Sequence, residues 1–90
     1  MRQNVSSTWS IKWDSRAIKE VAAFPKEDQK RIITAVEELV ADPYCGKLLK
    51  GRWKGLRRLR VGGYRVIYAL RREQLTILLL RVGQRRDVYR

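Results

Sequence analysis

Arginine side chains recur in the second half of this chain at spacings that bring them onto one surface. Alternate residues of a strand share a face, so Arg58 and Arg60 are expected to point the same way. Arg65 follows the glycine pair at positions 62–63, a signal for a tight hairpin, and is expected to lie beside Arg60. Guanidinium groups keep their charge and offer paired, planar donors, which suits them to phosphate. Further arginines accompany the next strand-like segment and its end: Arg81, Arg85 and Arg86.

Tyrosines are interleaved with these arginines, and they leave two interpretations open. Arginine together with aromatic rings is typical of surfaces that bind single-stranded RNA, because bases stack on the rings. Tyr64 and Tyr68 fit that pattern, but two residues on one strand face can equally belong to the core on the helix side. Tyr89 lies in a short basic tail with little core to join, which favours a role in binding.

Cleavage of RNA without a metal or cofactor is the chemistry that such a surface favours. A ribose 2′-hydroxyl attacks the adjacent phosphate while arginines neutralise the developing charge, usually the largest contribution in such a step. The chain has no histidine, which excludes a Ser-His triad, a histidine base and a histidine-ligated metal, and carboxylates at metal-binding spacing are absent. Arginine is a poor base, so proton transfer is the least explained step, and Lys54 is the nearest lysine in sequence.

The net charge of +12 is confined to one half of the chain. Residues 1–42 hold seven basic and seven acidic side chains, whereas residues 43–90 hold fourteen basic and two acidic ones. This asymmetry predicts a partner rich in phosphates, or an acidic protein segment, in preference to a basic surface that is only solvated. The cations expected to bind RNA are Lys47, Lys50, Arg52, Lys54, Arg60, Arg81 and Arg86.

Helix and strand patterns describe the elements that must position these residues. Apolar and polar residues alternate over residues 9–13, which predicts a short strand. A helix capped by Asp14 or Ser15 is expected to end at Pro25, where a second helix begins and runs to Asp42. The two helices are expected to form an antiparallel hairpin. Their apolar stripes comprise Ala17, Ile18, Val21 and Ala22 in the first, and Ile32, Ile33, Val36, Leu39 and Val40 in the second.

The second half of the chain is expected to form an antiparallel sheet. Residues 43–55 are interpreted as an ordered loop with Leu48, Leu49 and Trp53 turned inward. The last of the strand segments is nearly all apolar, which predicts a central strand covered on both faces. The expected strands run over residues 56–61, 64–70 and 75–82.

Together these elements predict one small α+β domain over residues 9–90, preceded by a polar tail over residues 1–8. The helices cover one face of the sheet, and the first strand joins the sheet because a lone strand leaves backbone groups unsatisfied. The arginines then lie on the open face. Cys45 is the single cysteine, so an internal disulfide is excluded. No apolar run is long enough for a membrane span or a signal peptide, which favours a cytoplasmic protein.

Three stretches of the chain resemble the RelE/ParE toxin superfamily: residues 47–51 (KLLKG), 59–68 (LRVGGYRVIY) and 81–90 (RVGQRRDVYR). The order of strand, two helices and three strands is similar as well, so the resemblance extends over nearly the whole chain. It implies a toxin of a type II toxin–antitoxin pair, silenced by a cognate acidic, RelB-like antitoxin. Members of one branch cleave messenger RNA in the ribosomal A site, whereas ParE-like members inhibit DNA gyrase on the same fold.

The resemblance to the cleaving branch implies catalytic roles for four residues. Arg65 is implied to stabilise the phosphate in the transition state. Arg85 is implied to lie near the leaving group, and Tyr89 to stack on or orient the substrate base. Arg58 stands at a basic position that is a lysine in well-studied members of the superfamily.

Two positions depart from that pattern. Leu56 stands where the well-studied members carry a second lysine, the presumed general base, and Gln84 stands where many relatives have histidine or lysine. The base is therefore left open between Lys54, Arg58 and a group of the ribosome. The same departure keeps a gyrase inhibitor as the alternative function.

Overall fold

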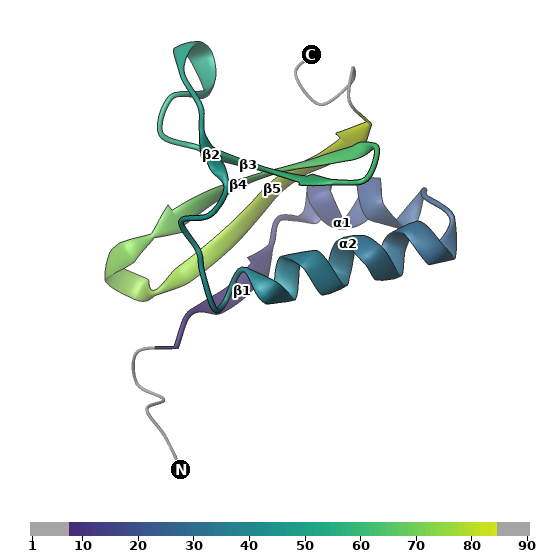
Figure 1. Cartoon of the computed structure of the whole chain (residues 1–90), viewed down its shortest axis with the longest axis horizontal. Helices are drawn as coiled ribbons and strands as arrows, with labels where there is room; N and C mark the ends of the chain where they lie inside the picture. The colour runs from purple at the N-terminus through teal and green to yellow at the C-terminus, as the bar shows by residue number, and fades with distance from the viewer. Residues whose placement is uncertain (1–7, 85–90) are drawn as a thin grey trace.

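The computed structural model describes residues 8–84, and within that range two helices pack against one face of a sheet (Figure 1). The strands of this described region lie in the order β1-β5-β4-β3-β2. Along the chain the elements are β1 (Ser10–Trp13), α1 (Ser15–Ala22), α2 (Lys26–Glu38), β2 (Lys47–Leu48), η2 (Gly51–Trp53), β3 (Arg57–Val61), β4 (Tyr64–Arg71), η3 (Arg72–Gln74) and β5 (Thr76–Gln84).

Three antiparallel strands form the larger part of the sheet, as predicted. β3 pairs with β4 across a turn at Gly62, whose φ of 58° glycine adopts without strain, and β4 pairs with β5. β1 returns to pair in parallel with β5, with Ser10 opposite Thr76. The predicted α+β architecture is confirmed, and so is the expectation that the first strand joins the sheet. The central strand is β4 rather than β5.

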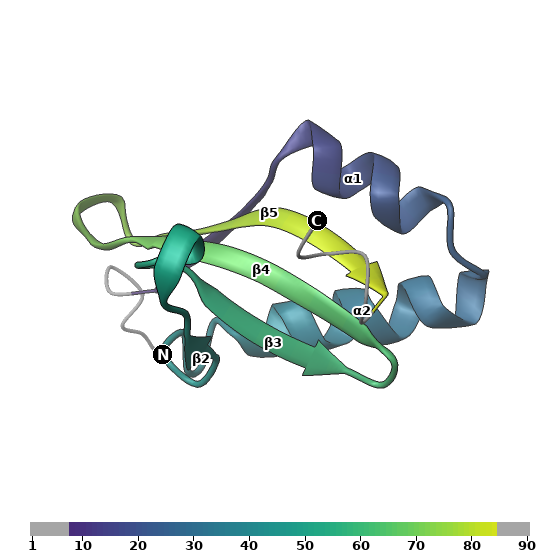
Figure 2. The same cartoon turned by 90° about the horizontal axis from the view of Figure 1, so that it is seen from above.

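Both helices begin close to where the sequence predicts. The Asp14 side chain caps α1 by accepting a hydrogen bond from the Arg16 N–H at 3.1 Å. α2 begins directly after Pro25, and Gln29 Nε2 donates to the Phe24 carbonyl at 2.8 Å, which ties α2 to the connection between the helices. Figure 2 shows α1 alongside β5 and α2 on the far side of the sheet from the viewer.

The core lies between the helices and one face of the sheet. Along β5, Ile77 and Leu79 are fully buried, whereas Leu78 and Leu80 are only half-buried. The expectation that this strand is covered on both faces is therefore wrong. Alternate residues point to opposite faces, and both described helices lie on the same face. The core cluster comprises Ala17, Val21, Ile32, Val36, Leu39, Val61, Val66, Tyr68, Ile77, Leu79 and Val82.

Four apolar residues that were expected to face inward lie at the surface: Ala22, Ile18, Ile33 and Leu48. The last three are 54%, 40% and 54% exposed. α1 buries Ala17, and each further residue of a helix is turned by about 100°, so Ile18 points away from the sheet. The same rotation carries Ile33 away from the buried Ile32. Leu48 belongs to β2, a two-residue edge strand in a segment for which the sequence predicts only a loop.

Candidate phosphate-binding face

The face of the sheet away from the helices carries a cluster of cations, which we call the basic face. Leu59, Val61 and Val66 pack toward the core, so the residues beside them in each strand point to the opposite face. The strand register then brings together residues from β2, β3 and β4. The basic face comprises Lys47, Arg58, Arg60 and Arg65.

These cations are arranged in like-charge pairs. Lys47 lies opposite Arg58, and Arg60 lies opposite Arg65. Opposed residues have Cβ atoms about 5 Å apart, and like charges at that spacing destabilise the sheet. In addition, the Arg58 Nε is buried and has no hydrogen-bond partner among the described residues. A bound polyanion would relieve the repulsion, so the arrangement favours phosphate binding.

A small pocket of about 120 Å³ lies at the tip of the hairpin between β3 and β4. Arg60 and Arg65 border it together with the two turn glycines and Tyr64. Gly63 leaves this region open, because a Cβ at that position would meet no heavy atom within 4 Å. Two guanidinium groups therefore border one hollow that an anion can enter.

The segment between β2 and β3, which we call the basic loop (residues 49–56), adds further cations. Its base is closed by a hydrogen bond of 2.8 Å from the Leu49 N–H to the Leu56 carbonyl. Figure 1 shows this loop rising from the sheet on the side opposite the helices, which is the side of the basic face. Its exposed cations are Lys50, Arg52 and Lys54.

Arg81, a predicted RNA-binding residue, takes part in an ion pair with α1. Its Nε lies 3.0 Å from Glu20 Oε2, and Glu20 Oε1 accepts the Val82 N–H at 2.8 Å. The pairing of β1 with β5 ends at Leu79. Glu20 therefore accepts the N–H of Val82 on a part of β5 that β1 does not reach. The Arg81 side chain is only 14% exposed, and it offers a ligand less surface than Arg60 does.

Replacing Glu20 by alanine is expected to lower the free energy of unfolding by about 2 kcal/mol. The change removes hydrogen bonds of a carboxylate to a guanidinium and to a backbone N–H, all partly buried. Glu37→Ala, at an exposed position of α2, is the control and is expected to change stability by less than about 0.5 kcal/mol. Urea unfolding followed by circular dichroism measures both, and equal stability of the two variants would contradict the assigned role of Glu20.

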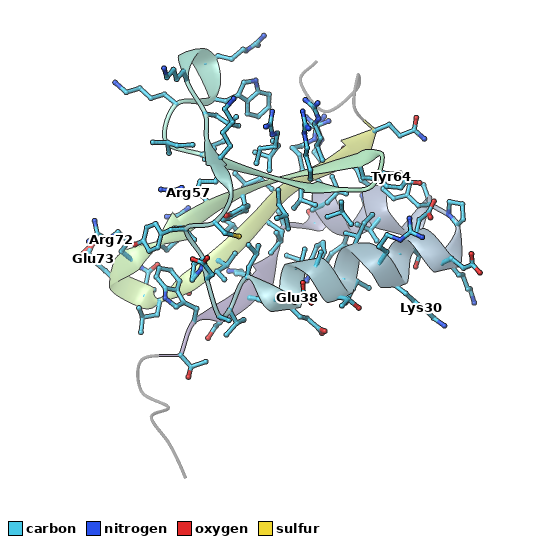
Figure 3. All side chains as sticks on the ribbon, viewed as in Figure 1. Lys30, Glu38, Arg57, Tyr64, Arg72 and Glu73 are labelled. Carbon is cyan, nitrogen blue, oxygen red and sulfur yellow. The ribbon has the colours of Figure 1, made fainter. Side chains whose placement is uncertain are left out.

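Tyr64 and Tyr68 both lie on the helix side, which decides between the two interpretations of the sequence in favour of the core. The Tyr64 hydroxyl donates to Asp28 Oδ2 at 2.6 Å, and this hydrogen bond raises the pKa of Tyr64. Tyr68 is fully buried, and burial raises the pKa of its hydroxyl. Figure 3 shows Tyr64 next to the helices at one end of the sheet and Arg57 at the other end.

Leu56 is half-buried just before β3, and Gln84 is exposed at the end of β5. No group of three or more histidine, cysteine or carboxylate residues in the range 8–84 could hold a metal ion. Within the same range no helix is long and apolar enough to cross a membrane. Three predicted site residues lie outside the described residues: Arg85, Arg86 and Tyr89.

Arg57 is not singled out by any pattern in the sequence; it faces the helix side of the sheet and binds backbone carbonyl oxygens rather than a ligand. Its Nη1 donates to the carbonyl oxygens of Tyr44 at 3.1 Å and Gly46 at 2.8 Å. Its guanidinium also lies 5.1 Å from the centre of the Tyr44 ring. No periodic pattern in residues 43–55 predicts these contacts, because they join a loop to a strand.

Solved structures share the fold of two helices on one face of a mixed sheet. The toxin–antitoxin complex RelBE2 from Mycobacterium tuberculosis is similar, with a TM-score of 0.80, 25% identity, and 87% of this chain and 99% of that chain covered. The archaeal RelE-RelB complex from Pyrococcus horikoshii has a TM-score of 0.72 and 26% identity, over 89% of this chain and 98% of that chain.

A ParDE system from P. aeruginosa has the same fold, with a TM-score of 0.70 and 19% identity over 87% of this chain and 97% of that chain. No curated protein matches the chain by sequence. Residues 11–89 match the family described as "ParE toxin of type II toxin-antitoxin system, parDE", and the chain belongs to that family. It is therefore a toxin of a type II toxin–antitoxin system within the RelE/ParE superfamily.

Proposed function

We propose that this toxin is a ribosome-dependent endoribonuclease that cleaves messenger RNA in the A site. The observation that carries the proposal is the pair of Arg60 and Arg65, which face each other across the hairpin and border a pocket open to an anion. Paired guanidinium donors suit a phosphate whose charge grows in the transition state. The proposed catalytic residues are Arg58, Arg65, Arg85 and Tyr89.

In the proposed reaction the ribose 2′-oxygen forms a bond to phosphorus, and the bond from phosphorus to the 5′-oxygen breaks. A base takes the proton of the 2′-hydroxyl, and the leaving 5′-oxygen acquires a proton. The products therefore carry a 2′,3′-cyclic phosphate and a 5′-hydroxyl. Arg65 stabilises the phosphate, Arg85 acts near the leaving group, and Tyr89 orients the base of the nucleotide. No metal or cofactor enters this scheme.

The proposed partners are the ribosome with its messenger RNA and an acidic, RelB-like antitoxin, all in the cytoplasm. The basic face and the basic loop offer the cations for both kinds of partner, and the charge of +12 supports long-range attraction. The antitoxin is supported as a partner because several similar toxins were solved in complex with a RelB-like antitoxin. Residues 47, 50, 52, 54, 60, 81 and 86 are the proposed RNA-binding positions.

Inhibition of DNA gyrase without nuclease activity is the second candidate function. Two observations favour it: the matching family is that of ParE toxins, and Leu56 replaces a lysine that the cleaving branch carries. The basic surface is compatible with this candidate, since it would serve an acidic protein segment as well as RNA.

Mapping of RNA 5′ ends in cells after induction of the toxin tests the proposal. We expect new ends with 5′-hydroxyl groups inside codons of translated messages, in register with the reading frame, and absent from an uninduced culture. Intact messages accompanied by gyrase-linked DNA breaks would overturn the nuclease and support the gyrase inhibitor.

A further inference from the structure

The buried hydroxyl of Tyr68 is bonded to a loop rather than to its own sheet. Tyr68 lies on β4 with no exposed surface, and its Oη donates to the Pro43 carbonyl at 2.8 Å. The same oxygen accepts a hydrogen bond from the Gly46 N–H at 3.0 Å. One side chain therefore holds the backbone at both ends of residues 43–46, which we call the clamp segment.

Arg57 holds the clamp segment from β3. As described above, it binds two carbonyl oxygens of this segment and lies over the Tyr44 ring. Trp9 meets the same ring edge-on, with the ring centres 6.1 Å apart. The clamp segment is thus fixed from β4, from β3 and from the residue before β1.

The chain that follows the clamp segment is cationic and begins with a very short strand. β2 consists of two residues, and so short a strand adds little stability by itself. It sets Lys47 opposite Arg58, a like-charge pair that opposes the strand pairing. The basic loop comes next along the chain. Contacts made before Lys47 therefore add to the short pairing with β3 in fixing the positions of β2 and of the basic loop.

We propose that Tyr68 is a positioning residue, whose hydroxyl fixes β2 and the basic loop beside the basic face. Cations of the loop then contact the same polyanion as the arginines of β3 and β4. Tyr68 lies on the helix side of the sheet and contacts no ligand itself. This inference rests on the RNA binding proposed above. The cations that Tyr68 places are Lys47, Lys50, Arg52 and Lys54.

The test compares Tyr68→Phe with Thr76→Val in the full chain. Each change removes one hydroxyl that donates to a backbone carbonyl, but Thr76 of β5 binds the Gln74 carbonyl and leaves the clamp segment intact. The salt dependence of binding to a short oligouridine is measured. Each phosphate contact contributes about 0.7 to the slope of log K against log salt, so Tyr68→Phe is expected to reduce the slope by roughly 1.5–3. Thr76→Val is expected to keep the wild-type slope.

Cys45 supplies an independent readout, because it is the single cysteine of the chain and lies exposed within the clamp segment. A nitroxide spin label on Cys45 is expected to give a sharper, more mobile spectrum in Tyr68→Phe than in the wild type. Thr76→Val is expected to retain the wild-type spectrum. A loss of global stability alone does not change the spectrum of the folded protein, so the label reports the clamp segment itself.

An unchanged salt slope in Tyr68→Phe, or a label as immobile as in the wild type, would overturn the positioning role. If Tyr68→Phe does not fold, Arg57→Met releases the same segment from β3. It is then expected to reduce the slope by more than the ~0.7 that one lost contact explains, and a smaller reduction overturns the proposal. A wild-type chain that does not bind oligouridine would refute the proposed RNA binding instead, while the spin label still decides whether Tyr68 holds the segment.

Discussion

An Arg65→Ala chain is expected to lose its toxicity while it folds as the wild type does. Arg65 lies on the basic face, opposite Arg60 and at the border of the hairpin pocket. A fixed guanidinium facing a developing phosphate charge contributes about 3–4 kcal/mol, so cleavage should slow by roughly 10²–10³. The side chain is half-buried beside a turn, and its loss should lower the free energy of unfolding by less than about 1 kcal/mol. Growth after induction and cleavage of ribosome-bound message measure the first effect, and thermal unfolding measures the second.

Arg71→Ala is the matched control for this substitution. Arg71 lies on the same strand and the same face as Arg65, at the other end of β4, and it is exposed. The two variants lose the same charge, so they differ only in position. Toxicity should survive in Arg71→Ala. Equal loss in both variants would mean that total charge, and not the place of Arg65, determines the activity, and an unfolded Arg65→Ala chain would make Arg65 structural.

The order and type of the main elements could be predicted because their signals are local. Pro25 marks the start of α2, and the glycine pair at 62–63 marks the hairpin. The partner of β1 has no such signal, since Ser10 pairs with Thr76 across most of the chain. β2 was missed because two residues make no periodic pattern. The position of β2 depends on the hydrogen bonds of Tyr68 and Arg57 to Gly46, and no sequence pattern predicts these long-range contacts.

The basic face could be predicted from strand alternation, but alternation alone could not place every site residue. Alternation places Arg58 beside Arg60, and with Arg65 on their face it places Tyr64 and Tyr68 on the other face, but it does not show which of the two faces the helices cover. The ladder between β4 and β5 is also irregular between Ile67 and Tyr68. A bulge of this kind inserts an extra residue, so strict alternation along β5 cannot place Arg81. Its ion-pair partner, Glu20, lies 61 residues earlier in the chain.

A Gly46→Ala substitution is expected to lower the free energy of unfolding by about 3 kcal/mol. An added Cβ would clash with the Tyr68 hydroxyl and lie 2.9 Å from the carbonyl oxygen of Arg58, a backbone atom that cannot turn aside. Overpacking of this kind costs about 1–3 kcal/mol, and displacement of the Gly46 N–H from Tyr68 adds about 1 kcal/mol. For a chain of this size each kcal/mol shifts the Tm by about 4–8 °C, so Tm should fall by roughly 12–24 °C.

Gly63→Ala is the matched control, because the same methyl group added at that position meets nothing within 4 Å. It should change stability by less than about 0.5 kcal/mol. Calorimetry of the two variants therefore separates the crowding at Gly46 from the general effect of removing a glycine from the chain. A Gly46→Ala chain as stable as Gly63→Ala would show that the clamp segment moves away from Tyr68 at little cost. In that case the hydroxyl of Tyr68 would not hold β2 against β3, and the cations that follow Gly46 would owe their position to other contacts.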